Sequence, residues 1–164
     1  MPTEVPEIDA HDGRILAELQ RDARITMAEL GRRVHLSQPA VTERVRKLEM
    51  SGFVKGYRAI VDYQRLGYGI RAVVRVGRVD YARMIKLIEQ TPEVVNAFNV
   101  TGEDSWLLEI AVIDVEHLDA VVTKFCILGE TSTSIVLNMP RENAAVLPAR
   151  RESIKPAIRK VTGR

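Results

Sequence analysis

The sequence contains little cysteine, few aromatic residues and no long apolar run. Cys126 is the single cysteine among 164 residues, so no disulfide can form within the chain, and we expect a reducing, cytoplasmic setting. No stretch of about 18 apolar residues occurs, which argues against a transmembrane helix and a membrane partner. The acidic start, MPTEVPEIDAHDG, lacks the apolar core of a signal peptide. Because 46% of the residues are hydrophobic and 28% are charged, we expect a globular protein with a substantial core.

Side chains that perform catalysis or hold metals are also sparse. The three histidines, His11, His35 and His117, stand alone, without cysteines or acids at a metal-ligand spacing. No glycine-rich phosphate loop and no pairing of a nucleophile with a base can be recognised. We therefore expect no metal, no cofactor and no enzymatic activity. Cys126 falls on an apolar face of an expected helix, where a buried and inert thiol is the default.

Charge is distributed unevenly along the chain. Residues 24–58 carry eight cations and three acids, whereas residues 1–23 carry two cations and six acids. Residues 67–140 are net acidic, and residues 141–164 carry seven cations and two acids. The concentration of cations in 24–58 favours a polyanionic partner, although a charged helix face is often merely solvated.

Three short amphipathic helices are expected in the N-terminal part. Asp9 and Thr26 are N-cap residues for the first two, and TMAE from Thr26 onward is a capping box. The third helix begins after Ser37, and its apolar positions 41, 45 and 48 fall on one buried face. Only about two residues separate the second and third helices. That spacing is typical of a helix-turn-helix, whose second helix lies in the DNA major groove.

The exposed face of the third helix suits double-stranded DNA. A glutamine can read an adenine edge with two hydrogen bonds, serine and threonine can contact bases or phosphates, and arginine and lysine neutralise phosphates. The positive N-terminal end of the helix also favours an anion. The candidate DNA contacts are Arg32, Arg33, Ser37, Gln38, Pro39, Thr42, Arg44, Arg46, Lys47 and Arg58.

A second domain is expected beyond a hinge. FVKGYRAIVDY at 53–63 is rich in β-branched and aromatic residues and predicts a wing strand, which completes a winged helix-turn-helix domain at 1–63. QRLGYG at 64–69 marks the hinge. The patterns at 70–140 follow the order β-α-β-β-α-β of a ferredoxin-like domain, an antiparallel sheet with two helices on one face. The fold class is therefore α+β, and a basic C-terminal extension occupies 141–164.

The other face of the predicted sheet has no cover in this chain. Arg71, Val73 and Arg75 would line one side of the first strand, and the residues between them would line the other. Uncovered sheet faces of this kind usually meet a second copy. We therefore expect at least a homodimer.

In this order, the two domains resemble the Lrp/AsnC (feast/famine) family of transcriptional regulators. The resemblance rests on ELGRRVHLS, RVRKLE and GFVKGY in the first domain, and on VTGEDSWLL and TSTSIVL in the second. It implies dimers built through the ferredoxin-like domains and often assembled into octamers. It also implies DNA binding modulated by an amino acid or related metabolite held between dimers. His35 stands where such motifs often have glycine, and histidine tolerates the left-handed region better than most residues.

In similar proteins the turn TGEDS borders the effector pocket, although by itself it is also compatible with a plain hairpin. Free backbone N–H groups of such a turn can bind an α-carboxylate, and Glu103 or Asp104 can bind an α-ammonium. Relatives often place the Asp one position later, so the choice between the two acids stays open. The candidate effector-binding residues are Thr101, Gly102, Glu103, Asp104, Ser105, Thr131, Thr133 and Ser134.

Two other functions stay open at this point. An architectural protein would wrap DNA through many weak sites, with a steep salt dependence and little response to a ligand. Some proteins of this fold are enzymes that act on tetrapyrroles, which would require histidine and arginine side chains in a pocket of the second domain. His117 alone gives that interpretation little support, and the basic third helix argues against it.

Overall fold

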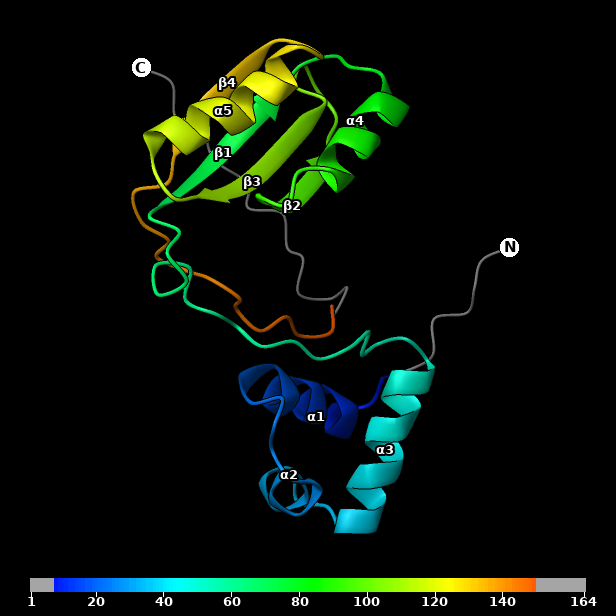
Figure 1. Cartoon of the computed structure of the whole chain (residues 1–164). Helices are drawn as coiled ribbons and strands as arrows, with labels where there is room; N and C mark the ends of the chain where they lie inside the picture. Colours follow the sequence, from blue (N-terminus) through cyan, green and yellow to red (C-terminus); the bar gives the residue numbers. More distant parts are fainter. Residues whose placement is uncertain (1–7, 150–164) are drawn as a thin grey trace, which may run out of the picture. The chain divides into compact units, whose positions relative to one another are not determined.

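The computed structural model describes residues 8–149, and these residues form two compact units (Figure 1). Within the described chain, the first unit contains residues 8–59 together with 143–149, and the second contains Ile60–Glu142. The division after Ala59 lies a few residues before the expected hinge at 64–69. Of the expected basic extension at 141–164, Arg141 and Glu142 belong to the second unit and residues 143–149 belong to the first.

Three helices form the first unit, drawn in blue and cyan in Figure 1: α1 (Ala10–Arg21), α2 (Met27–Val34) and α3 (Gln38–Met50). Each begins after a residue whose side chain accepts backbone N–H groups, as the sequence predicts: Asp9, Thr26 and Ser37. Apolar side chains at helical spacing meet in one core. Its buried members are Ile15, Leu19, Ile25, Leu30, Val34, Val41, Val45 and Leu48. The predicted helix-turn-helix is confirmed.

The turn between α2 and α3 is tight. His35 closes α2 in the left-handed conformation, with φ 58° and ψ 46°, as expected for the position where similar motifs place glycine. A Cβ on Gly31 would lie 2.7 Å from the carbonyl oxygen of Leu36, so a larger residue there would force the turn to move. The Leu36 N–H also donates to the Gly31 carbonyl oxygen at 2.9 Å. Glycine inside α2 thus allows the chain to turn closely into α3.

The strand expected at 53–63 is not formed, which corrects the prediction of a wing. These residues run as coil and turns. Tyr57, Ile60 and Val61 are 49%, 72% and 48% exposed, so their side chains are not buried in a core. A segment of high β-propensity becomes a strand when a neighbouring strand pairs with its backbone N–H and C=O groups. The described residues of this single chain provide no such neighbour.

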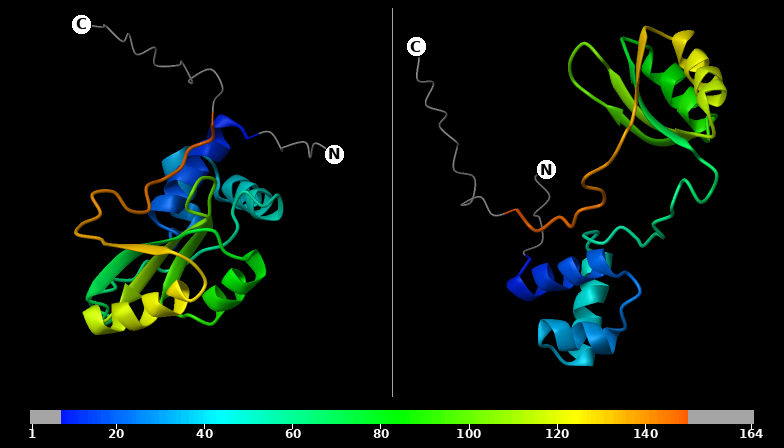
Figure 2. Two further views of the ribbon diagram at one scale, coloured as in Figure 1. Left: turned by 90° about the horizontal axis from the view of Figure 1, so that it is seen from above. Right: turned by 90° about the vertical axis from the view of Figure 1, so that its left-hand side faces the viewer.

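The second unit is a four-stranded sheet with two helices. In chain order its elements are β1 (Ile70–Val76), α4 (Tyr81–Glu89), β2 (Val94–Asn99), β3 (Trp106–Val112), α5 (Val115–Cys126) and β4 (Thr131–Ile135). The strand order is β2-β3-β1-β4 and every neighbouring pair is antiparallel, which confirms the ferredoxin-like domain. Both helices lie on the same side of the sheet (Figure 2). In the described part of the chain, no helix has the length and apolar character of a membrane span.

The two faces of the sheet differ because side chains alternate along each strand. Ala72, Val74 and Val76 of β1 are fully buried, as are Leu108 and Ile110 of β3, and these residues share a core with α4 and α5. No helix of the described chain covers the opposite face, here called the open face. On β1, β2 and β3 the residues of the open face are Arg71, Val73, Arg75, Asn96, Phe98, Leu107, Glu109 and Ala111.

Candidate functional site

Exposed polar side chains mark the N-terminal half of α3. Gln38, Pro39 and Thr42 are exposed, whereas the two valines on the opposite side of the helix are buried. The Thr42 hydroxyl donates to the Gln38 carbonyl oxygen at 2.8 Å, which holds the threonine side chain in place. Ser37 accepts the Ala40 N–H at 3.4 Å, so its hydroxyl oxygen serves as the helix cap. The side chain of Gln38 forms no hydrogen bond with another described residue and projects from the first turn.

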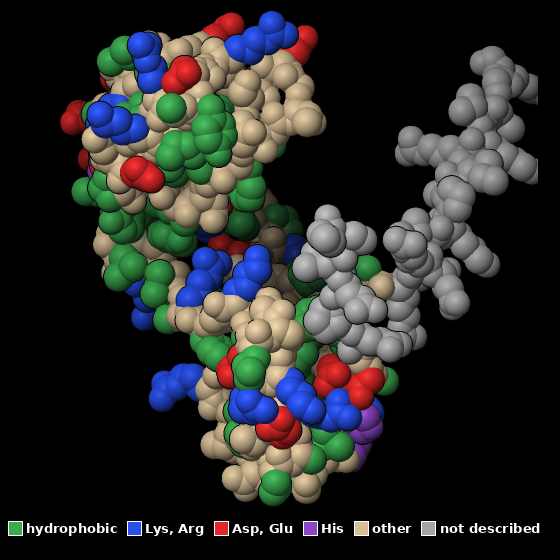
Figure 3. Space-filling model, turned by 90° about the vertical axis from the view of Figure 1, so that its right-hand side faces the viewer, with side chains coloured by type: hydrophobic (Ala, Val, Ile, Leu, Met, Phe, Trp, Pro, Cys, Tyr) green, Lys and Arg blue, Asp and Glu red, His purple; other side chains and the backbone are tan. Residues whose placement is uncertain are grey.

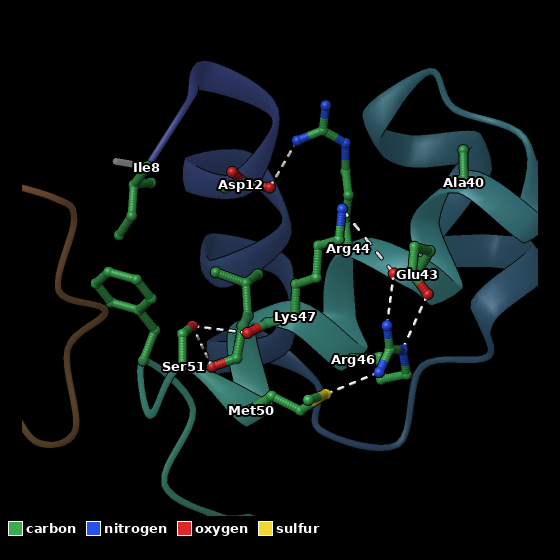
Figure 4. Close-up of a pocket in the computed structure, with 11 residues that line it drawn as sticks. Ile8, Asp12, Ala40, Glu43, Arg44, Arg46, Lys47, Met50 and Ser51 are labelled. Atoms are coloured by element: carbon green, nitrogen blue, oxygen red, sulfur yellow. Dashed lines mark hydrogen bonds and ion pairs between the residues drawn. The ribbon is translucent and has the colours of Figure 1, made fainter. Parts of the chain in front are cut away.

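Carboxylates hold both arginines of α3. Arg46 donates from Nε and Nη2 to the two carboxylate oxygens of Glu43, at 2.9 and 2.7 Å. Arg44 Nη1 lies 2.7 Å from Asp9 Oδ2 and 2.8 Å from Asp12 Oδ1, and so joins α3 to the start of α1. Figure 4 shows the contact with Asp12. Hydrogen bonds from the Asp12 backbone and from Arg44 lower the pKa of Asp9 to about 2. Arg44 is therefore a bridge between helices in the free protein.

The arginines of α2 are paired as well. Glu29 accepts Arg32 Nη2 at 2.7 Å and Arg33 Nε at 2.8 Å, and Arg33 also reaches Glu18 of α1 at 2.9 Å. The hydrogen bonds from Arg32 and Arg33 lower the pKa of Glu29 to about 2. The Glu29 N–H donates to Thr26 Oγ1 at 3.2 Å, but the Glu29 carboxylate binds the arginines. The TMAE segment thus forms half of the expected capping box.

Ion pairs with carboxylates limit how the cations of the first unit can bind phosphates. A phosphate has to replace a carboxylate at Arg32, Arg33 or Arg46. Exposed ion pairs of this kind are weak because water screens them, so replacement is accessible. Lys47 lies 3.9 Å from the nearest carboxylate and is exposed. Arg58 is exposed and forms no ion pair with another described residue. Figure 3 shows the resulting surface, on which blue cationic and red acidic side chains lie next to each other.

The turn TGEDS joins β2 to β3. Gly102 has φ 127°, a conformation that favours glycine, and Thr101, Gly102 and Glu103 are exposed. Ser105 closes the turn, since its carbonyl oxygen accepts the Val100 N–H at 2.9 Å and its own N–H donates to Val76 at 3.0 Å. The two acids differ in their surroundings. Asp104 is half-buried, and its Oδ2 lies 3.9 Å from Nε of Arg75, a cation of β1 that the sequence did not single out for this site.

The β4 candidates lie at the same end of the sheet as this turn. Thr131 pairs with Val76, which pairs in turn with Trp106 directly after the turn. Thr131 and Thr133 face the helices, while Ser134 faces the open side, because side chains alternate along the strand. The three residues therefore do not form one cluster. Cys126 is exposed and its Sγ lies 2.9 Å from Thr131 Oγ1, so the prediction of a buried thiol was wrong.

A polar cluster on the open face was not predicted as such. The Arg71 guanidinium contacts the Glu109 carboxylate and also lies 2.9 Å from Glu142, while Asn96 donates to Glu109 at 2.8 Å. Burial raises the pKa of Glu109, but the hydrogen bonds from Asn96 and Arg71 outweigh burial and leave it below its usual value. The alternation of Arg71 with buried residues was visible in the sequence. Its partners depend on the register between strands, which only the structure provides.

His117 is also paired, although it stands alone in the sequence. Its Nε2 lies 3.0 Å from a carboxylate oxygen of Glu93, and this hydrogen bond lowers the pKa of Glu93. The pair lies across β3, α5 and the start of β2, where Glu93 also accepts the Ala111 N–H through its backbone. Among the described residues, no group of three or more histidine, cysteine or acidic side chains is arranged to hold a metal ion.

Comparison with known proteins gives the family. The AsnC-type helix-turn-helix domain matches residues 8–49, and the Lrp/AsnC ligand binding domain matches residues 71–146. The HTH-type transcriptional regulator LrpC of Bacillus subtilis is 33% identical over 134 residues, which make up 80% of this chain and 93% of the relative. The chain belongs to the Lrp/AsnC family. It is thus a transcriptional regulator, and the enzymatic alternative is set aside because the relatives are regulators.

Solved structures of other Lrp/AsnC proteins agree with this membership. A transcriptional regulator of Neisseria meningitidis in complex with L-methionine aligns with a TM-score of 0.79 at 28% identity, over 85% of this chain and 96% of that one. A feast or famine regulatory protein from M. tuberculosis, complexed with L-methionine, aligns with a TM-score of 0.79 at 29% identity, over 87% of this chain and 100% of that one. Both relatives bind an amino acid.

Proposed function

We propose that this Lrp/AsnC regulator reads double-stranded DNA with the N-terminal half of α3 and adjusts its DNA binding to an amino acid. The observation that carries the DNA part is the exposure of Gln38, Pro39 and Thr42 on the first turns of α3, in a domain of the AsnC helix-turn-helix type. Gln38 is free to make two hydrogen bonds to one base, and Thr42 lies one turn further along the same face. These two residues are the proposed base contacts.

The cations of the first unit have three roles in this proposal. Lys47 and Arg58 bind phosphates directly, because they are exposed and weakly paired or unpaired within the described chain. Arg32, Arg33 and Arg46 bind phosphates by exchanging a carboxylate for a phosphate oxygen. Arg44 instead fixes α3 on α1 through Asp9 and Asp12, and Ser37 acts first as the helix cap. Fewer residues are therefore proposed to contact phosphates than the sequence suggested.

The amino acid effector is proposed to bind where the turn TGEDS and the start of β4 meet one end of the sheet. A site for an α-amino acid must offer hydrogen-bond donors to the carboxylate and an anionic group to the ammonium. Asp104 is the proposed partner of the ammonium, since it is half-buried and held near Arg75, whereas Glu103 is exposed. Backbone N–H groups of the turn, where Gly102 leaves room, bind the carboxylate, and Thr131 lies at the same end of the sheet.

The regulator is proposed to act as a homodimer built through the open face of the sheet. Phe98 and Leu107 are cross-strand partners on that face, Val73 lies diagonally from Leu107, and Phe98 is 54% exposed in the single chain. These apolar side chains are stabilised when a second copy removes them from water. An octamer is the larger assembly that family resemblance suggests.

Substitutions at the two proposed base contacts test the DNA part. Gln38→Ala and Thr42→Val should each weaken binding to a selected high-affinity duplex by roughly 5- to 150-fold, the equivalent of about 1–3 kcal/mol, and should leave binding to random duplexes nearly unchanged. Gln90→Ala, an exposed glutamine of the second unit, is the matched control. Fluorescence anisotropy gives all affinities. If both variants bind the selected duplex as the wild type does, α3 does not read the sequence.

A further inference from the structure

Arg75 is the last residue of β1 on the open face, and it lies beside the turn TGEDS. The Ser105 N–H donates to the Val76 carbonyl oxygen at 3.0 Å, so the backbone of the turn is attached to β1 one residue beyond Arg75. Asp104 directly precedes Ser105 in the turn. The nearness of Arg75 to Asp104 therefore follows from the backbone as well as from two flexible side chains.

The ion pair between Arg75 and Asp104 is loose. Arg75 Nε lies 3.9 Å from Asp104 Oδ2, well beyond the length of about 2.7–2.9 Å that is usual for a charge-assisted hydrogen bond. The two side chains are 43% and 49% exposed, and neither forms a hydrogen bond with another described residue. The donors of the guanidinium and the oxygens of the carboxylate are therefore available to a small molecule.

Arg71, on the same face of the same strand, has different surroundings. Its guanidinium contacts Glu109 and Glu142 and lies 4.9 Å from the ring centroid of Tyr63, and its side chain is only 20% exposed. Carboxylate partners of this kind satisfy a cation that is mostly removed from water. Within the described chain, Arg75 has no comparable set of partners. Of the two arginines on β1, Arg75 is the one whose charge is open to an external anion.

We propose that Arg75 selects the effector by binding a carboxylate of its side chain, so that the amino acid is a dicarboxylic one, glutamate or aspartate. The inference rests on the effector site proposed above, where backbone N–H groups of the turn bind the α-carboxylate and Asp104 binds the α-ammonium. Once Asp104 pairs with the ammonium, it no longer balances the charge of Arg75. A second carboxylate restores the balance, and a guanidinium can bind it with two parallel hydrogen bonds.

A neutral amino acid gives the Arg75 guanidinium no such partner, and Asp104 would then serve the ammonium and the guanidinium at once. The penalty is limited because water still solvates the half-exposed Arg75. We therefore expect the acid to bind roughly ten- to a hundredfold more tightly than its amide, less than the roughly 10⁴- to 10⁵-fold of a site whose unpaired group is buried. Glu103 repels a second carboxylate only weakly, since it is exposed and water screens its charge.

Pairs of amino acids of nearly equal shape test the inference. L-glutamate and L-glutamine differ in a carboxylate and an amide, as do L-aspartate and L-asparagine. Calorimetry on the full chain should give roughly ten- to a hundredfold tighter binding of the acid in at least one pair. Arg75→Gln should remove this preference by weakening the binding of the acid. Arg83→Gln, the same change of charge at an exposed position of α4, is the matched control and should keep the preference of the wild type.

Two further substitutions of Arg75 separate its charge from its shape. Arg75→Lys should keep part of the preference, because the positive charge remains and the two parallel hydrogen bonds are lost. Arg75→Glu should reverse the preference, so that L-lysine binds more tightly than L-glutamate, because the introduced carboxylate pairs with a side-chain ammonium. Thermal melting followed by circular dichroism shows whether each variant is folded.

The outcomes separate the inference from the proposed function. If the wild type binds the acids no more tightly than their amides, the inference is wrong, while an effector site for another amino acid still stands. If Arg75→Gln weakens the acid and the amide equally, Arg75 binds the α-carboxylate and the inference is likewise wrong. Asp104→Ala should weaken both members of each pair, because both carry the α-ammonium. If the wild type binds no amino acid at all, the proposed effector site fails, and the inference fails with it.

Discussion

Replacing Gly31 with alanine tests the tight α2–α3 turn, on which the orientation of α3 depends. Alanine favours a helix by about 0.8–1.0 kcal/mol over glycine, so helix propensity alone predicts stabilisation. At this position, however, the new Cβ would lie 2.7 Å from the Leu36 carbonyl oxygen, and Leu36 N–H holds that turn to Gly31. Overpacking of a fixed backbone costs about 1–3 kcal/mol, and we take the upper end because no flexible side chain can yield. The expected net effect is a loss of about 2 kcal/mol.

Gly13→Ala is the matched control, since Gly13 also lies inside a helix but its Cβ would meet only Pro148 at 3.7 Å. It should stabilise the first unit by about 0.4–1 kcal/mol. Amide hydrogen exchange of peptides from residues 10–50 reports the stability of this unit separately from the other. Gly31→Ala should also weaken DNA binding, because the N-terminal end of α3 moves. If Gly31→Ala stabilises the first unit as Gly13→Ala does, the contact between the new Cβ and the Leu36 carbonyl oxygen does not destabilise the unit. That result would refute the expected loss of stability.

Three further predictions concern the charges and the open face. The pKa of Asp9 is lowered from 3.8 to about 2, so the stability that Asp9 contributes is present above about pH 4 and is lost as the pH falls toward 2. Hydrogen exchange of α1 peptides should show a smaller acid-induced loss of stability in Asp9→Asn than in the wild type. An equal loss in both would contradict this role of Asp9. Asp104→Ala should weaken binding of the amino acid by roughly ten- to a hundredfold in calorimetry, because it removes a charge-assisted hydrogen bond worth about 1.5–3 kcal/mol, and it should leave DNA binding without ligand intact. If the variant and the wild type bind the amino acid equally well, Glu103 or the backbone holds the ammonium. Phe98→Asp should produce a monomer in light scattering, whereas Val115→Asp, at an exposed position of α5, should remain dimeric; a dimeric Phe98→Asp variant would exclude the open face as the interface.

The sequence predicts local structure well where a single helix or strand decides it. The caps Asp9, Thr26 and Ser37 and the apolar spacing of the helices are local signals, and they give the helix-turn-helix correctly. The segment 53–63 shows where this reasoning stops. Its β-propensity is high, but strand formation depends on a partner, and propensity carries no information about whether a partner is present.

The candidate site shows the same division. The exposure of Gln38 and Thr42 follows from helical periodicity, and the positive φ of His35 follows from its place after α2. The bridge from Arg44 to Asp9, by contrast, joins residues 35 positions apart, and the nearness of Arg75 to Asp104 depends on strand register. Such partners come from tertiary packing. A chain that carries many cations and acids offers too many possible pairs for sequence alone to choose among them.

The central claim is that this protein recognises particular DNA sequences and that an amino acid changes this recognition. The direct measurement is selection of duplexes from a random pool, followed by anisotropy titration of the best duplex with and without each amino acid. The account predicts a preferred sequence, bound at least about 10³-fold more tightly than random DNA, and a 5- to 150-fold change in affinity with one or a few amino acids. Equal binding to all duplexes with a steep salt dependence, and no response to any amino acid, would contradict the account and favour an architectural protein that wraps DNA.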